Sequence, residues 1–117
     1  MYREFVVPGD QEILEAIGEW PEGDEDSDVR SLTLRGVGAE RIVLSYDALA
    51  RSVRVRWRNG GGDEILDIFR EGATRMAVHS ESGATYFSLE FQSGECVGSM
   101  TIRVFPSLTV TDRLLFA

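Results

Sequence analysis

Few residues of this chain have side chains that could carry out catalysis or hold a metal. His79 is the only histidine and Cys96 the only cysteine among 117 residues. A catalytic imidazole needs a nucleophile within reach and a third group that orients it. Ser80 and Ser82 are close in sequence, but Ser80 points to the opposite face of a strand from His79, and no G-x-S-x-G motif is present. One histidine and one cysteine also cannot form a structural zinc site, so the sequence predicts no catalytic residue, no metal site and no cofactor.

One acidic segment begins like a calcium-binding loop but does not continue as one. Residues 24–28 read D-E-D-S-D, which matches the D-x-D-x-D opening of an EF-hand. An EF-hand needs glycine at its sixth position and glutamate at its twelfth, where this chain has Val29 and Arg35. We therefore expect no calcium site in this loop.

Three arginines could instead bind an anion. Arg54, Arg56 and Arg58 alternate with apolar residues, so in a strand they share one face at intervals of about 7 Å. Two of them, Arg54 and Arg56, would form a ligand site with His79 on the concave face of a sheet. We favour the simpler interpretation, in which these arginines pair with acids of neighbouring strands. The net charge of −8 also argues against nucleic acid as a partner.

The negative charge is concentrated near the start of the chain. Residues 1–28 hold ten acids and one arginine, whereas residues 29–117 hold ten acids and eleven arginines. Such an asymmetry attracts cationic partners. The candidate partner-binding residues are six acids together with one tryptophan: Glu19, Trp20, Glu22, Asp24, Glu25, Asp26 and Asp28.

A single helix precedes a long run of strands. The spacing of Ile13, Leu14 and Ile17 predicts an amphipathic helix over residues 11–20, with Asp10 as its N-cap and Pro21 as its stop. The apolar residues 2–7 before it predict a short strand or a docked arm. From Val29 onward the apolar residues recur at every second position, which is typical of strands.

One segment fits two structures. Residues 63–71 could form a helix that is capped by Asp63 and ended by Gly72, or a strand that is partly buried on both faces. We favour the strand, because the next strand begins near Thr74 and leaves little room for a helix to turn and pack. The predicted core consists of Trp57, Phe87, Leu89, Phe91, Met100 and Ile102.

The pattern predicts one domain over residues 1–117, of the α+β class. Short turns force neighbouring strands to run antiparallel. We therefore expect one N-terminal helix packed on a mainly antiparallel, curved β-sheet or half-open barrel.

The helix and the segment after it resemble part of a known group of proteins. Residues 17–21 (I-G-E-W-P), the acidic loop and residues 29–34 (V-R-S-L-T-L) resemble small immunity proteins of bacterial polymorphic toxin systems. The resemblance implies a short helix that ends in Trp-Pro and leads into an antiparallel β domain. It implies a protein that neutralises a cognate toxin by binding it, without catalysis. The group often has an aromatic-His-Asp step where this chain has residues 22–28, so the resemblance supplies no site residues.

These observations favour a non-enzymatic binding protein over an enzyme. We expect an immunity protein of the bacterial cytoplasm that occludes a basic toxin domain or another cationic protein. With no run of 18 apolar residues, the sequence predicts no membrane span. The alternative is a small-ligand-binding or enzymatic β domain with its site at Arg54, Arg56 and His79. An unpaired edge strand could also hold the chain in an oligomer, so the oligomeric state stays open.

Overall fold

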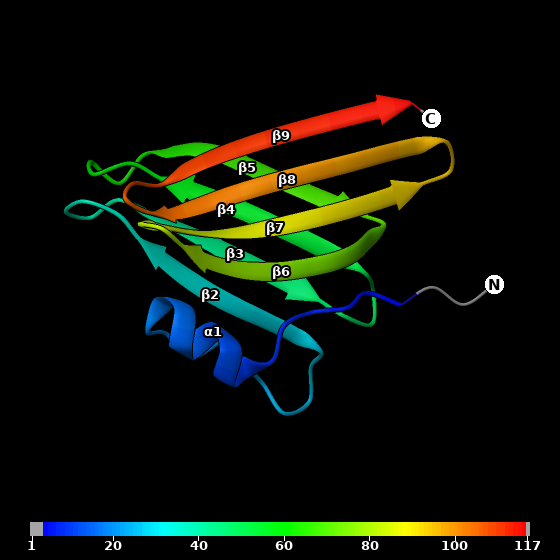
Figure 1. Cartoon of the computed structure of the whole chain (residues 1–117), viewed down its shortest axis with the longest axis horizontal. Coiled ribbons are helices and arrows are strands. Elements are labelled where there is room, and N and C mark those ends of the chain that lie inside the picture. The colour runs from blue at the N-terminus through cyan, green and yellow to red at the C-terminus, as the bar shows by residue number, and fades with distance from the viewer. Residues whose placement is uncertain (1–3, 117) are drawn as a thin grey trace.

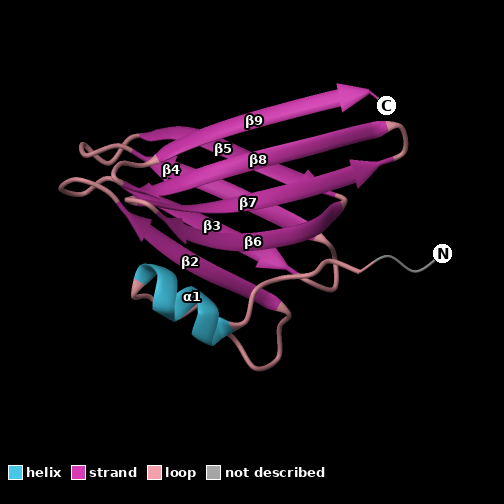
Figure 2. Ribbon diagram, viewed as in Figure 1, coloured by secondary structure: helices cyan, strands magenta, loops and turns pink. Residues whose placement is uncertain are grey.

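Two antiparallel sheets form the body of the computed structural model, which describes residues 4–116 (Figures 1 and 2). Within each sheet, every strand pairs with its neighbour in the sequence. The first sheet contains β1 (Glu22–Gly23), β2 (Val29–Arg35), β3 (Arg41–Asp47), β4 (Ser52–Arg58) and β5 (Glu64–Glu71). The second contains β6 (Ala73–Glu81), β7 (Ala84–Ser93), β8 (Cys96–Phe105) and β9 (Thr109–Phe116).

The predicted class is confirmed, since the chain has one N-terminal helix and antiparallel strands that divide between two sheets. Residues 63–71 lie in β5, so the strand interpretation is confirmed. Gly72 alone separates β5 from β6 and carries the chain from one sheet to the other. No helix in residues 4–116 is long and apolar enough to cross a membrane.

The helix ends earlier than the sequence predicted. α1 spans Asp10–Ile17, and Gly18 follows it in the left-handed conformation (φ 74°) with its N–H bonded to the Leu14 carbonyl at 2.8 Å. Glycine adopts this conformation without strain and therefore ends a helix, so the predicted stop at Pro21 was wrong. The predicted N-cap was also wrong, because Gly9 occupies that position and Asp10 is the first helical residue.

The segment before the helix is a docked arm. Val6 pairs in parallel with β6, donating its N–H to the Thr74 carbonyl at 3.0 Å and accepting from Met76 N–H at 2.8 Å. Phe5 and Ile13 are buried in the core, and α1 contacts β6 while lying alongside β2 (Figure 1). The arm and helix therefore cover the side of the molecule where β2 and β6 face each other. Tyr2, which belonged to the predicted arm, lies outside the described residues.

The core lies between the apolar faces of the two sheets. Its largest members on the first sheet include Leu32, Leu44 and Val55, and Phe87 and Ile102 are among those on the second. The predicted core residues are all buried except Trp57, which is partly buried and packs against the core. The core also contains a phenol: burial, with a smaller effect of the Asp10 carboxylate, raises the pKa of Tyr46 to about 12.

An ion pair joins the two sheets where β5 faces β9. Arg70 Nη1 and Nη2 donate to the two carboxylate oxygens of Asp112 at 2.6 and 2.7 Å. The guanidinium also lies over the Phe91 ring, 5.2 Å from its centroid. Its hydrogen bonds hold the pKa of Asp112 below the ordinary value of a carboxyl group. The contact is two-pronged and about three-quarters shielded from solvent, a geometry in which charged hydrogen bonds are strong.

Replacing Gly72 with alanine should destabilise the fold. Gly72 has φ +83°, and an added Cβ would lie 2.8 Å from the Gln92 carbonyl oxygen. We expect the free energy of unfolding to fall by about 2 kcal/mol in a urea titration. Gly60→Ala is the matched control, because nothing lies within 4 Å of a Cβ there. Equal stability of the two variants would show that the β5–β6 connection does not need glycine.

Removing the Asp112 charge should change stability in a pH-dependent manner. Because the folded state lowers this pKa, the pair stabilises the fold above about pH 4 and loses its effect as pH falls through the folded pKa. We expect Asp112→Asn to lower the free energy of unfolding by about 1 kcal/mol at pH 7, with the difference from the parent chain shrinking below pH 4. Asp28→Asn, at an exposed loop position, serves as the control.

Candidate functional site

The predicted partner-binding acids lie along one edge of the first sheet. Glu19 contacts Arg35 at the end of β2, and the chain then runs back so that Glu22 and Gly23 of β1 pair with Ser31 and Arg30. The turn of residues 24–28 leads into the start of β2. We call these six acids the acidic edge: Glu19, Glu22, Asp24, Glu25, Asp26 and Asp28.

The turn within the acidic edge is held by hydrogen bonds. The Asp24 carbonyl accepts from Ser27 N–H at 3.1 Å, and its carboxylate accepts from Asp26 N–H at 3.3 Å. Ser27 Oγ accepts from Val29 N–H at 3.1 Å, and Arg30 Nη1 donates to the Ser27 carbonyl at 3.1 Å. These bonds fix the backbone that carries the acids, so a partner orders fewer groups on binding than it would with a free tail.

Most of these charges are not neutralised by the arginines that the structure describes. Among residues 4–116, Glu19 is the one member of the acidic edge in an ion pair, with Arg35 Nε at 3.4 Å. The other five are exposed. Glu19 follows the end of α1, so the expectation that the helix would hold it was wrong. Trp20 is 52% exposed beside these acids.

No cluster of metal ligands accompanies this charge. Within the described part of the chain, no group of three or more histidine, cysteine, aspartate or glutamate side chains is placed to hold a metal ion. The acids are spread along β1 and the turn, an arrangement that suits an extended cationic surface better than a single ion.

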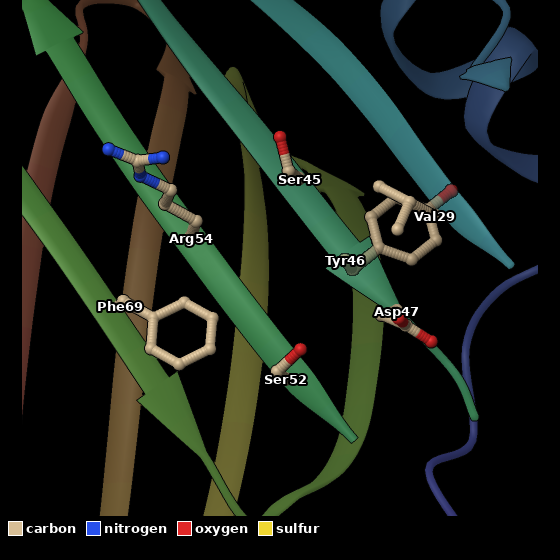
Figure 3. A pocket seen from close by; sticks show the side chains of 7 residues that line it. All are labelled: Val29, Ser45, Tyr46, Asp47, Ser52, Arg54 and Phe69. Carbon is tan, nitrogen blue, oxygen red and sulfur yellow. The ribbon is translucent and has the colours of Figure 1, made fainter. Parts of the chain in front are cut away.

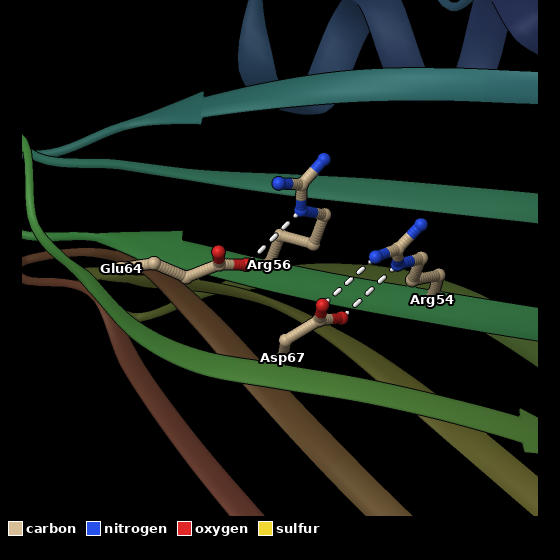
Figure 4. Close-up of polar contacts among 4 residues, drawn as sticks. All are labelled: Arg54, Arg56, Glu64 and Asp67. Carbon is tan, nitrogen blue, oxygen red and sulfur yellow. Dashed lines mark hydrogen bonds and ion pairs between the residues drawn. The ribbon is translucent and has the colours of Figure 1, made fainter.

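Two of the predicted anion-binding arginines are already paired. Arg54 donates from Nε and Nη2 to the Asp67 carboxylate at 3.0 and 2.8 Å, and Arg56 Nε donates to Glu64 at 3.1 Å (Figure 4). The hydrogen bonds from Arg54 lower the pKa of Asp67. Both acids belong to β5, next to β4, so these two arginines adopt the favoured arrangement with neighbouring strands.

The structure does not bring the alternative ligand site together. Arg54 lies between the buried Val53 and Val55 and therefore points outward from the first sheet. His79 follows Val78, which packs on the core, and so points outward from the second sheet. The core separates the two outer faces, and Arg56 lies on the same side as Arg54. These residues cannot contact one ligand.

His79 has a partner that the sequence analysis missed. Its Nε2 lies 2.9 Å from Ser88 Oγ, and its ring stacks on Tyr86 with centroids 4.7 Å apart. The register of the β6–β7 hairpin, which pairs His79 with Tyr86, was the signal that could have revealed them. Within residues 4–116 no acid hydrogen-bonds to the imidazole, so the arrangement lacks the orienting group of a nucleophile–base pair.

A shallow groove crosses the outer face of the first sheet. It has a volume of about 400 Å³, and its lining residues are Val29, Ser45, Tyr46, Asp47, Ser52, Arg54 and Phe69 (Figure 3). Phe69 is 61% exposed. The apolar pattern of residues 63–71 predicted a strand but did not indicate which face would carry this ring. The register that sets Phe69 opposite Arg54 would have shown it.

Comparisons with known proteins give a match of fold. No protein-family model and no curated protein sequence matches this chain. A solved structure does, with a TM-score of 0.84 and 18% sequence identity over 98% of this chain and 100% of the other. It is described as a contact-dependent growth inhibition toxin - immunity protein complex from Klebsiella pneumoniae 342. The resemblance to immunity proteins that residues 17–34 suggested is therefore matched by a resemblance in fold.

Proposed function

We propose that this chain is an immunity protein that binds a toxin and blocks it without catalysing a reaction. The observation that carries the proposal is the shared fold, which extends over nearly the whole of both chains and belongs to a toxin–immunity complex. The acidic edge adds to it, because five of its carboxylates are exposed, make no ion pair within residues 4–116 and can meet a cationic surface. We further propose that the chain acts in the cytoplasm of a bacterium.

The proposed mechanism is electrostatic steering followed by occlusion. The acidic edge attracts a basic toxin surface and raises the rate of association by about 10- to 1,000-fold at low salt. Trp20, which is exposed beside Glu19 and Glu22, would then pack against the toxin and exclude water. Toxins that act on nucleic acids need cationic clefts, and an acidic protein seated in such a cleft would block access.

Growth protection by the chain tests the proposal directly. A toxin domain is sought among the genes next to the one that encodes this chain, and it is expressed with and without the chain in a sensitive bacterium. We expect the toxin to stop growth alone and the chain to restore it, with the two purified proteins forming a stable complex in size-exclusion chromatography. A toxin that neither binds the chain nor is neutralised by it would contradict the proposal.

Neutralising the acidic edge should slow the encounter with the toxin. The variant replaces its five unpaired members by their amides: Glu22→Gln, Asp24→Asn, Glu25→Gln, Asp26→Asn and Asp28→Asn. We expect the association rate constant to fall at least about 10-fold at low salt, with a flatter dependence on salt and a nearly unchanged dissociation rate. Stopped-flow fluorescence measures both rates.

A control variant that loses the same number of negative charges distinguishes local steering by the acidic edge from an effect of the net charge of the chain. Five exposed acids elsewhere are replaced by amides at Asp63, Glu71, Glu81, Glu90 and Glu95. We expect this control to change the association rate less than about 3-fold, because steering depends on charges near the contact. An equal effect of the two variants would mean that the acidic edge has no special role.

A further inference from the structure

The outer face of the first sheet carries three arginines side by side on three strands. Arg35 of β2 pairs in register with Arg41 of β3, which pairs with Arg58 of β4. Arg35 follows the buried Leu34, Arg41 precedes the buried Ile42, and Arg58 follows Trp57, which packs against the core. All three side chains therefore point outward. We call Arg35, Arg41 and Arg58 the arginine row.

Most of the charge of this row has no partner within the molecule. Among residues 4–116, Arg41 and Arg58 make no ion pair, and Arg35 makes one contact, with Glu19 at 3.4 Å. A hollow of about 150 Å³ lies between Arg41, Arg56 and Arg58, with Val43 as its apolar floor. The Arg41 and Arg58 guanidinium groups beside it are therefore open to a ligand from outside, whereas Arg56 is paired with Glu64.

The arrangement opposes the stability of the fold. Like charges that lie directly opposite one another on neighbouring strands repel. Arg41 is affected twice, because it lies between Arg35 and Arg58. By contrast, Arg54 and Arg56 on the same face form ion pairs with acids of the next strand, where Glu64 bonds to Arg56 and not to Arg58. Ion pairs within the sheet thus explain why Arg54 and Arg56 lie on this face, but they do not explain the arginine row.

We infer that the arginine row is a docking site for an acidic segment of the toxin. The inference rests on the proposed function and adds a second contact to it. Guanidinium groups bind carboxylates through two parallel hydrogen bonds, and a row of them fits a run of aspartate or glutamate side chains. The acidic turn lies at the other end of β2, about 20 Å away at 3.3 Å per residue. A partner that carries a basic surface opposite the acidic turn and an acidic segment opposite the arginine row would therefore bind in one orientation.

The surroundings of the row favour protein over nucleic acid. Glu19 adjoins one end of the row, and Glu64 pairs in register with Arg58 at the other. A long polyanion that followed the row would therefore meet acids at both ends. On the same outer face, Phe69 is exposed opposite Arg54, four residues along β4 from Arg58, where it lines a groove of about 400 Å³. An apolar ring next to charged groups is typical of protein interfaces.

Arg41→Gln is expected to stabilise the free chain and weaken the complex. Relief of repulsion should raise the midpoint of thermal unfolding by about 1–4 °C. Toxin affinity should fall about 10-fold, as measured by calorimetry. The control is Arg113→Gln on the outer face of the second sheet, where the residue paired with Arg113 is the neutral Ser99. We expect the control to change neither quantity. Toxin affinity unchanged by Arg41→Gln would overturn the inference.

A probe of the free chain tests the row without the toxin. Hexaglutamate is titrated at low ionic strength while the arginine Nε–Hε signals are followed by NMR. We expect the signals of Arg41 and Arg58 to shift, the signal of Arg113 to stay, and the Arg58 shift to weaken in Arg41→Gln. If the hexanucleotide of uridine binds the same arginines more tightly than hexaglutamate does, the row is a nucleic-acid site and the inference is overturned. The absence of a shift with either probe would overturn it as well.

The two experiments separate this inference from the proposed function. If the toxin binds the parent chain and Arg41→Gln equally well, the inference fails and the proposed function stands. If the parent chain does not bind the toxin but hexaglutamate shifts the row, the proposed function fails and the row remains a carboxylate-binding surface.

Discussion

Burial of two apolar sheet faces against each other is the constraint on which this structure depends. Each sheet has a single apolar face, and neither could leave it exposed to water without losing most of its stabilisation. Gly72 satisfies the constraint by turning the chain from β5 directly into β6, on the opposite sheet. The Arg70–Asp112 pair then joins β5 to β9, while the arm and α1 cover the side at β2 and β6.

Because the core occupies the inner faces, the outer faces are free to carry charge. The first sheet uses this freedom unevenly. Five acids along β1 and the turn before β2 make no ion pair within residues 4–116, and at the far end of the sheet neither do Arg41 of β3 and Arg58 of β4. The ion pairs of Arg54 and Arg56 join β4 to β5, on the side of the sheet away from β1 (Figure 4). Separated charges of both signs on one rigid face can orient a partner as well as attract it.

The sequence predicted what depends on local pattern. Alternation of apolar and polar residues predicted the strands, the shared face of Arg54 and Arg56 and the core position of Phe87. Local pattern does not say which strand joins which sheet, so the division at Gly72 could not be predicted. The end of α1 was missed because a left-handed glycine stops a helix before a proline three residues later can do so.

The candidate site was predictable to a similar extent. Composition alone identified the acidic edge, because it is continuous in the sequence. The arginine row was not identified, because Arg35, Arg41 and Arg58 become neighbours only through the registers of two hairpins. The same reason explains the missed contact of His79 with Ser88, and the separation of His79 from Arg54 follows from the division into two sheets.

The parallel pairing of Val6 with β6 has a consequence for how the protein is made. The two strand positions that meet there are separated by nearly seventy residues, including the whole of the first sheet. A ribosome releases the chain from its N-terminus, so the arm and helix emerge long before the strand that receives them. Throughout that interval Phe5 and Ile13 have no β6 to pack against. The arm and helix, although synthesised before the strand that receives them, are therefore among the last segments to reach their final places.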